Sequence, residues 1–463
     1  MPESDIVVRD VQWSRILPIG HLLRAFRIAL WPPAKLVLAL VALSIVIGAG
    51  MLLDLRFKTN VYSKSFQENL CDVFQAAQGY YVEPAPEASF TVPGAGGGLS
   101  VLAKERAWRV EKLEPRASMS PSFESMIGMR GFYFGPLEAF RHACRLAVRY
   151  GAEAPWFAVS FFAIWFLTTT FFGGAICRLA ALQFARDERA TLREALAFTC
   201  KRYGTLLAGR LGLFIVILLL MLPTGLVVSG VLQLGGVGQM VTGALFFLVL
   251  GLGILAALLF IFGLGSQFQI LAAVAAEGRD AFDAVSRSVN YVFARPWRYF
   301  LYTLFSVFYL CLTFVVVRLF ALLVLKILYV SINFMLVEFW PGLLAWFGGS
   351  GRPSDLGRIW IEPTMNQLFV MPADAEGATR VAATLIGVYV FILLGLMMAF
   401  IPSFLMTSQT IIYFILRRKV DSRDMDEVCQ EFGPESGAPA TVEKTEQTVV
   451  EPEPPAAGSQ EQL

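Results

Sequence analysis

Charged and apolar residues are strongly segregated along this chain. The longest uncharged run, from Leu211 to Ala276, contains no Asp, Glu, Lys, Arg or His. A membrane-spanning helix needs roughly 20 apolar residues, so the run is long enough for two spans. Gly235-Gly236-Val237-Gly238 near its middle predicts the turn between them. A soluble core does not need so long an uncharged stretch, and we therefore expect the chain to lie in a bilayer.

The other apolar runs predict four further spans, and hence an all-α integral membrane protein built as a six-span helical bundle. The expected spans cover residues 36–53, 155–177, 205–234, 239–265, 299–318 and 381–416, with the third and fourth forming a hairpin over 205–265. The fifth run continues in apolar residues beyond 318. The first run begins only at Leu36, too far along for a cleavable signal peptide, and is typical of an uncleaved anchor.

The distribution of Lys and Arg predicts the orientation, because cytoplasmic loops of membrane proteins are enriched in these residues. The basic segments are residues 1–35, 178–204, 266–298 and the start of 417–463. With six spans all four fall on one side, whereas the turn after the third span is uncharged. We therefore expect both termini in the cytoplasm and a bacterial inner membrane as the location.

Composition supports the membrane assignment and argues against several kinds of site. Charged residues make up 16% of the chain, against about 25% in average soluble domains. The two histidines, His21 and His142, fall in segments expected on opposite sides of the membrane, which argues against a His-based metal site or a Ser/His/Asp triad. The chain has no CxxC pair and no glycine-rich phosphate-binding motif. We expect no enzyme activity, no cofactor, no metal and no nucleic-acid binding.

Residues 54–154 form the larger expected external segment. Helix-like stretches at 65–77 and 136–150 flank a Pro/Gly-rich middle at 83–98. The segment lacks a dense apolar core, so we expect a cap packed on extended spans. Either it is a ligand- or partner-binding ectodomain or it is an elaborated loop. Cys71 and Cys144 lie in this segment and would pair in an oxidising compartment if their Cα atoms are within about 7 Å.

The second expected external segment, residues 319–380, begins beside two cations, Arg318 and Lys326, that flank an apolar stretch. A cation at the bilayer centre is costly, and such a residue is a candidate functional site. Alternatively, both side chains lie at the outer interface and reach the headgroups. Because the fifth span already reaches about 20 residues at Arg318, we favour the interfacial interpretation.

The tail, residues 417–463, opens with Arg417-Arg418-Lys419 and then becomes acidic and rich in Pro, Gly, Ser and Thr. Such a stretch buries too little apolar surface to offset the entropy of ordering. We therefore expect disorder after Val420. The tail is either an interaction segment or a solubilising end.

A proline followed two residues later by a cation recurs before two spans, as Pro33 with Lys35 and as Pro296 with Arg298. The surrounding segments, 24–36 and 287–299, align without gaps. In each, the proline would end an amphipathic cytoplasmic helix and the cation would anchor the span at the headgroups. The hypothesis is three helix-plus-hairpin pseudo-repeats, at about 10–177, 178–265 and 266–416. The alternative is that the basic loops of any six-span protein show similar sequence patterns by chance.

The cytoplasmic segment before the fifth span carries the most specific residue pattern. Its E-G…A…R-S positions are Glu277, Gly278, Ala284, Arg287 and Ser288. We expect Glu277 and Asp283 to pair with Arg279, Arg287 or cations of a neighbouring repeat. The segment resembles one in a loose group of polytopic bacterial membrane proteins, which are related to the membrane domain beside some glycerophosphodiester phosphodiesterases. The resemblance implies a fold only, since no catalytic domain or His/Glu metal cluster follows.

Two classes of function fit these observations. One is a membrane scaffold or partner-binding protein, and the other is a permease or channel subunit. A polar path through the spans, lined by Arg318, Lys326, Gln233 or Thr168–Thr170, would favour transport, whereas a packed apolar interior would favour the scaffold. An intramembrane enzyme is not expected, because no acid–base or metal cluster lies within the spans. The expected partners are the bilayer with its anionic headgroups, and proteins that contact the external segment or the acidic tail.

Overall fold

The computed structural model describes most of the chain before residue 430. The described residues are 19–59, 61–62, 64–77, 134–339, 377–425 and 427–429, with the isolated positions 343, 346, 356, 360, 362 and 363. Helices account for nearly all of this part of the chain, and no strand occurs in it. The Pro/Gly-rich stretch at 83–98 lies outside the described residues.

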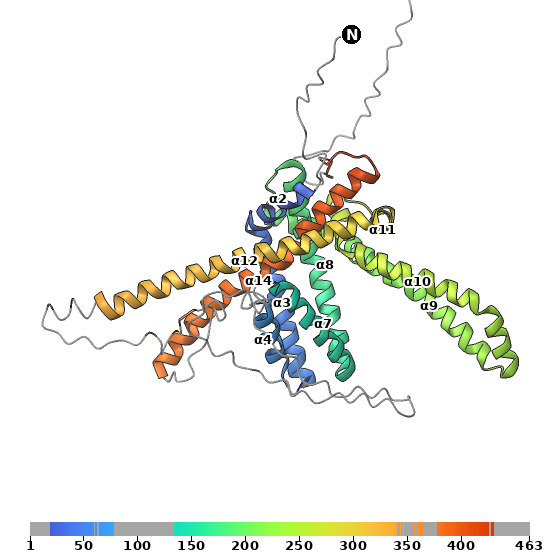
Figure 1. Cartoon of the computed structure of the whole chain (residues 1–463), viewed down its shortest axis with the longest axis horizontal. Coiled ribbons are helices and arrows are strands. Elements are labelled where there is room, and N and C mark those ends of the chain that lie inside the picture. Colours follow the sequence, from blue (N-terminus) through green and yellow to red (C-terminus); the bar gives the residue numbers. More distant parts are fainter. Residues whose placement is uncertain are drawn as a thin grey trace, which may run out of the picture. The chain divides into compact units, whose positions relative to one another are not determined.

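In the described part of the chain, six helices are long and apolar enough to cross a membrane, as expected from the hydropathy pattern (Figure 1). They are α3 (Ala34–Phe57), α8 (Pro155–Arg186), α9 (Leu192–Leu232), α10 (Gly236–Glu277), α12 (Pro296–Phe334) and α14 (Gly377–Val420). The prediction of an all-helical chain with six apolar helices is therefore confirmed.

Several of these helices extend well beyond the expected spans. In α9, Thr191 forms a capping box with Glu194, so the helix begins in the basic segment and continues into the apolar run. Helix α12 continues past Arg318 to Phe334, after which a π-helical turn, η1 (Met335–Phe339), follows. The helix continues beyond the expected end of the span at 318, because a run of helix-forming apolar residues follows Arg318 and nothing there breaks the helix.

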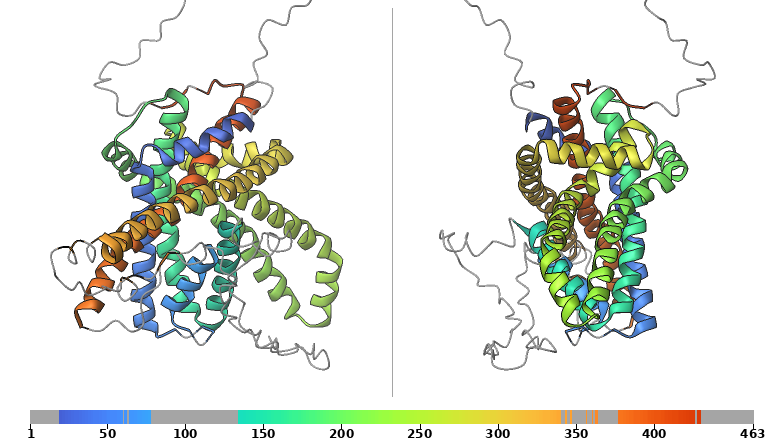
Figure 2. Two further views of the ribbon diagram at one scale, coloured as in Figure 1. Left: turned by 60° about the vertical axis from the view of Figure 1, so that its left-hand side comes forward. Right: turned by 90° about the vertical axis from the view of Figure 1, so that its right-hand side faces the viewer.

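Helix α14 forms the centre of the packing. It contacts α3, α8, α10 and α12, and also the short helix α2 (Ile19–Leu30). Its buried side chains include Phe400, Phe404 and Phe414. Figure 2 shows α3 and α8 running side by side, and these two helices are also in contact. A small residue also permits the close approach of α8 and α9, since a Cβ at Gly174 of α8 would lie 2.7 Å from a methyl carbon of Leu206 of α9.

The hairpin of α9 and α10 turns where the glycine pattern predicts. Gly235 directly precedes the first residue of α10. Its φ of +69° is a backbone conformation that residues other than glycine rarely adopt. A Cβ at Gly238 would lie only 1.9 Å from the Val231 carbonyl oxygen. The most apolar windows of α9 and α10 are 0% and 6% buried. Their apolar side chains are therefore covered by lipid or by a partner rather than by the rest of the chain.

Two helices occur at the positions expected in segment 54–154. They are α4 (Phe66–Ala77) and α7 (Gly135–Glu153), which pack on each other. A small apolar cluster around Phe66, Tyr150 and Phe157 holds them against α8. Asn69 donates hydrogen bonds to the Tyr150 hydroxyl and the Val61 carbonyl, both at 3.1 Å. The cysteines considered for pairing, Cys71 and Cys144, are both free and exposed.

Short helices precede α3 and α12, and each buries one face. Helix α2 buries Leu22, Ala25 and Ile28, which recur at a spacing of three residues. Helix α11 (Ala281–Ala294) buries Ala284 and Tyr291, seven residues apart. Helix α2 packs on α8, α12 and α14, and α11 packs on α9, α10, α12 and α14.

Candidate functional site

Among the described residues, the largest set of linked ion pairs surrounds the end of α10. Glu277 is the last residue of the helix, and Gly278 follows in the left-handed conformation with φ +62°. The Gly278 N–H donates to the Val274 carbonyl at 2.9 Å and closes the last turn. A Cβ at Gly278 would lie 3.0 Å from the Cys429 sulfur, so both conformation and space favour glycine. The Glu-Gly pair therefore ends the helix and brings the carboxylate under the C-terminal segment.

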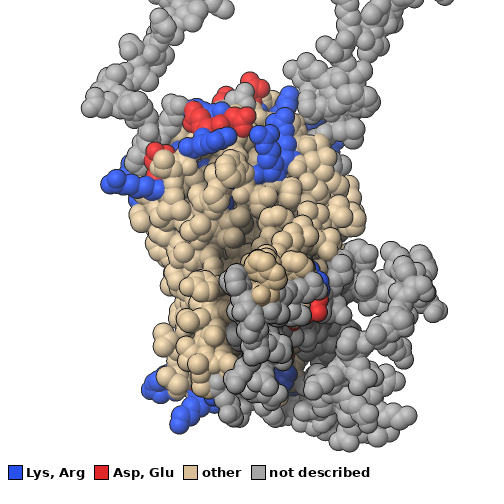
Figure 3. All heavy atoms as spheres, turned by 90° about the vertical axis from the view of Figure 1, so that its left-hand side faces the viewer, with Lys and Arg blue, Asp and Glu red and all other residues tan. Residues whose placement is uncertain are grey.

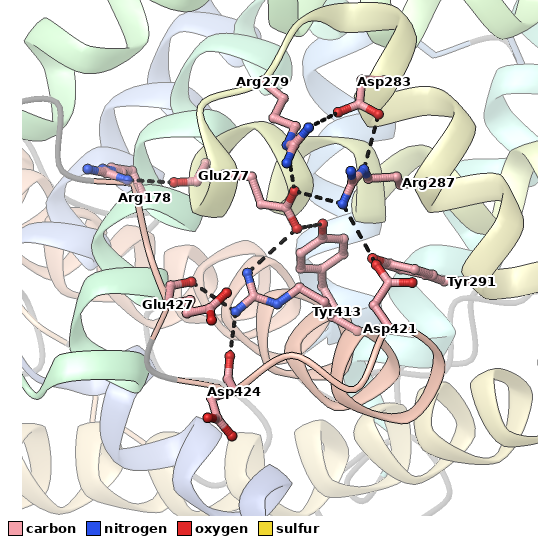
Figure 4. Close-up of polar contacts among 12 residues, drawn as sticks. Arg178, Glu277, Arg279, Asp283, Arg287, Tyr291, Tyr413, Asp421, Asp424 and Glu427 are labelled. Carbon is pink, nitrogen blue, oxygen red and sulfur yellow. Dashed lines mark hydrogen bonds and ion pairs between the residues drawn. The ribbon is translucent and has the colours of Figure 1, made fainter. Parts of the chain in front are cut away.

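The Glu277 carboxylate lies at the centre of an ionic network that joins three helices (Figure 4). Its Oε2 lies 3.1 Å from Arg279 Nε and 3.4 Å from Arg287 Nη1. Its Oε1 accepts a hydrogen bond from the Tyr413 hydroxyl at 2.8 Å and lies 3.6 Å from Arg417 Nη1. The Glu277 and Arg417 side chains are only 6% and 2% exposed. The expected pairing of Glu277 with local cations is present, and a cation at the far end of the chain joins it.

Asp283 completes the acidic side of the network on α11. It lies 3.0 Å from both Arg279 Nη1 and Arg287 Nε, four residues away in either direction. Burial opposes ionisation of this carboxyl, but hydrogen bonds and positive charge from Arg287 and Arg279 outweigh it and lower its pKa. Glu277, Asp283 and Asp421 thus face three arginines, since Arg287 Nη1 is also 3.7 Å from Asp421 Oδ2.

The segment that follows α14 is ordered and packs on this network, contrary to the expectation of disorder directly after Val420. Arg417 Nη2 donates to the carbonyl oxygens of Asp424 and Glu427 at 2.8 and 2.9 Å. Arg178 Nη2 donates to the Cys429 carbonyl at 2.7 Å, and the Cys429 N–H donates to the Ala276 carbonyl at 2.9 Å. The composition of the segment predicts disorder, but it does not reveal that arginines of distant helices bind the backbone carbonyls of the segment. Residues 430–463 of the tail lie outside the described residues.

The other predicted positions lie apart from the network. Pro33 precedes the first residue of α3, and Pro296 is the first residue of α12. Arg298 is exposed. Lys35 differs from expectation, because it is fully buried rather than exposed to headgroups. Its ammonium donates to the Ile28 carbonyl and, at 2.5 Å, to Gln183 Oε1, so it ties α2 and α3 to α8.

The two cations expected at the outer interface separate in the structure. Lys326 is partly exposed and forms an ion pair with Glu362. Arg318 is only 2% exposed and lies well inside α12. Its side chain packs inward and α12 continues for several turns beyond it, whereas the depth of Arg318 in a membrane stays a prediction.

Sequence reasoning missed Arg178, Arg210, Tyr291 and Tyr413, all of which are buried and hydrogen-bonded. Arg178 was taken only as part of the orientation pattern, and Arg210 was not singled out although it directly precedes the long uncharged run. The tyrosines gave no signal, since aromatic residues are common throughout the spans.

We expect the contact between Tyr291 and Asp421 to be lost at alkaline pH. Burial raises the pKa of the Tyr291 hydroxyl, and its hydrogen bond to Asp421 raises it further. The protonated hydroxyl is the donor, so the contact stabilises the fold below the ordinary tyrosine pKa of about 10. That stability is lost as pH rises through the higher pKa of the folded state. Tyrosinate absorbance titration should therefore lose one component that ionises above the ordinary tyrosine range in Tyr291→Phe. An unchanged alkaline end in Tyr291→Phe contradicts the assignment.

Chemically, the network resembles a structural clamp. Each carboxylate is matched by arginine, and the Glu277 oxygens are occupied by several donors. Among the described residues no group of three or more His, Cys, Asp or Glu side chains is placed to hold a metal ion.

Comparison with models of protein families, with curated proteins and with solved structures returned no match. The resemblance of the Glu277–Ser288 segment to other polytopic membrane proteins therefore stays a prediction from sequence.

Proposed function

We propose that this protein is an integral membrane scaffold or partner-binding protein, whose C-terminal segment is clamped to the basic end of the helix bundle. The observation that carries the proposal is the Glu277 network. It joins α10, α11 and α14, and the arginines next to it bind the segment 421–429. A network in which each carboxylate is matched by arginines supports a structural role better than a reactive one.

The residues proposed for a transport path support that alternative less well. Gln233 caps α9 at the exposed hairpin turn, and Lys326 pairs with Glu362. Thr169 and Thr170 accept hydrogen bonds from Arg210. These groups therefore belong to separate contact sets, rather than to one lined route. A permease or channel subunit remains the second candidate and is tested below.

The helix boundaries support the proposed pseudo-repeat in two of its three copies. With Pro33 aligned on Pro296, α2 and α11 end within one residue of each other, and α3 and α12 begin within one or two residues of each other. The middle copy departs from the pattern, because α9 is continuous from Leu192 and has no proline near its start. In this proposal α2 and α11 lie along the cytoplasmic interface, and α4 and α7 form the external cap.

Packing supports the proposed placement of the basic segments on one side. Helices α2 and α11 both pack on α14, and α11 also packs on α9. In Figure 3 most of the Lys, Arg, Asp and Glu side chains on the face shown gather at its upper end, beside a wide zone of other residues. This is the charge pattern of a cytoplasmic membrane surface.

We expect reporter fusions at residues 10, 195, 285 and 430 all to give cytoplasmic signals. The reason is the Lys/Arg asymmetry, which sets orientation during insertion. A fusion within the α9–α10 turn, at Gly236, serves as the control and should give the opposite signal. A periplasmic signal at any of the first four positions contradicts the six-span arrangement with cytoplasmic termini.

Site-specific photocrosslinking separates the scaffold from the permease. The photoreactive residue is placed at Phe140, an exposed position of α7, and at Val449 in the acidic tail. A matched control at Leu219 lies on the exposed apolar surface of α9. Discrete protein adducts at Phe140 or Val449, stronger than at Leu219, support partner binding. No adduct at either position, together with ion or solute flux through the purified protein in vesicles, overturns the scaffold in favour of the permease.

A further inference from the structure

A second buried cation lies away from the Glu277 network, where α8, α9 and α10 meet. Arg210 of α9 is 4% exposed. Its Nη1 donates to the hydroxyl oxygens of Thr169 and Thr170 at 3.3 and 2.8 Å, and its Nε donates to Gln267 Oε1 at 3.4 Å. Its guanidinium carbon lies 4.4 Å from the ring centroid of Phe166. One edge of the guanidinium is thus held by neutral groups from two neighbouring helices.

No carboxylate contacts Arg210 among the described residues. The reason is already in the sequence: α8 contains no Asp or Glu, α9 has none after Glu194, and α10 has none before Glu277. The Thr169 and Thr170 hydroxyls each donate their proton to the Phe166 carbonyl, so they act toward Arg210 only as acceptors. Neutral dipoles and a ring reduce the cost of burying the cation but leave its charge uncompensated.

The donor inventory of Arg210 indicates where an anion would bind. Guanidinium carries five N–H groups, and the three on Nε and Nη1 meet the acceptors named above. The two on Nη2 make none of these bonds within the described part of the chain. Gln267 also contributes an amide to the surroundings of Arg210, because its Nε2 carries two N–H groups and donates to the Arg210 carbonyl at 3.4 Å.

The depth of Arg210 matches that of a lipid phosphate. Arg210 immediately precedes the uncharged run, and residues 211–232 of α9 lead from it to the hairpin turn. At a rise of about 1.5 Å per residue this length is close to the roughly 30 Å of bilayer hydrocarbon. With the hairpin turn at one membrane interface, Arg210 would lie at the boundary between acyl chains and headgroups on the other side. Thr169 is only half-buried, so the site borders the surface of the helix bundle.

We propose that Arg210, oriented by Thr169, Thr170 and Gln267, is the binding site of a phosphate oxyanion, supplied by the headgroup of an anionic phospholipid. The charge of the phosphate neutralises a cation for which these three helices hold no counterion. The site is independent of the Glu277 network and of the scaffold proposal, since it would serve a scaffold or a permease equally.

The test is the ligand-dependent thermal stability of the full-length protein in detergent micelles. The probes are phosphatidylglycerol, phosphatidylcholine and inorganic phosphate, each added to wild type and to three variants. Arg210→Gln removes the cation, Thr170→Val removes one orienting acceptor but keeps the charge, and Arg298→Gln removes an exposed cation as the matched control. Because each variant is compared with itself with and without the probe, a loss of basal stability does not affect the readout.

We expect phosphatidylglycerol to stabilise wild type more than phosphatidylcholine does. Arg210→Gln should weaken this specific effect at least about tenfold in apparent affinity. Thr170→Val should weaken it by a smaller factor, because the charge remains but loses one orienting acceptor, and Arg298→Gln should retain it in full. If inorganic phosphate stabilises in the same Arg210-dependent way and phosphatidylglycerol does not, the oxyanion site stands but its source is a free anion. No specific stabilisation of wild type, or equal stabilisation of wild type and Arg210→Gln, overturns the site and leaves Arg210 as an interhelical clamp.

Discussion

Replacing Glu277 by Gln is expected to lower the free energy of unfolding by about 3–5 kcal/mol, the range observed when one partner of a buried ion pair is removed. The largest part of the loss arises at Arg417, whose side chain is 2% exposed and lies 3.6 Å from the carboxylate. The contact with Arg279 contributes little, because that arginine is 40% exposed and its charge is screened by solvent. The measurement is denaturant or thermal unfolding of the detergent-solubilised protein.

A matched control and a double-mutant cycle make this prediction specific. Glu188→Gln removes an exposed carboxylate that lies 4.0 Å from Arg186 Nη1, and should change stability by less than about 1 kcal/mol. The double variant Glu277→Gln/Arg417→Gln should lose less free energy of unfolding than the two single variants together. Each single variant leaves one buried charge without its partner, and the double variant does not. A stability loss for Glu277→Gln no larger than that for Glu188→Gln contradicts a central role for the Glu277 carboxylate.

The six helices were predictable because hydropathy is a local property. A run such as Leu211–Ala276 satisfies its backbone only as helix in a bilayer, and Gly235 supplies the positive φ that the turn needs. The ends of the helices were less predictable, because a helix does not have to end where the membrane does. Helix α9 begins at Leu192, far before its apolar run, because Thr191 and Glu194 cap it in the basic segment.

Only part of the Glu277 network was predictable, because only some of its contacts join residues that are close in sequence. Asp283 lies four residues from both Arg279 and Arg287, and helical spacing alone predicts those pairs. The contact of Glu277 with Arg417 joins residues 140 positions apart, and it exists only because α14 packs against α10. The orientation pattern had assigned Arg417 to the membrane surface, whereas the structure buries it. Tertiary packing, not residue type, made that difference.

The last prediction concerns the segment that follows α14 and compares two truncations. A chain that ends after Cys429 should keep the free energy of unfolding of the full-length protein to within about 0.5 kcal/mol, since it retains every contact described for the segment. A chain that ends after Val420 should lose at least about 3 kcal/mol. It removes the carbonyl acceptors of Arg417 and Arg178 and the partner of Tyr291, and contacts to charged groups contribute about 1.5–3 kcal/mol each.

A third chain, in which residues 421–429 are replaced by a Gly/Ser sequence of the same length, separates backbone from side-chain effects. It keeps the carbonyl oxygens that Arg417 and Arg178 bind but lacks the Asp421 carboxylate and the buried Val428 side chain. Its stability should therefore lie between those of the two truncated chains. Equal stability of the chains that end at 420 and at 429 would show that the segment 421–429 does not contribute to the stability of the fold. The expected order places the boundary between the folded protein and its acidic tail after Cys429, because the arginines of α8 and α14 extend the fold to that residue.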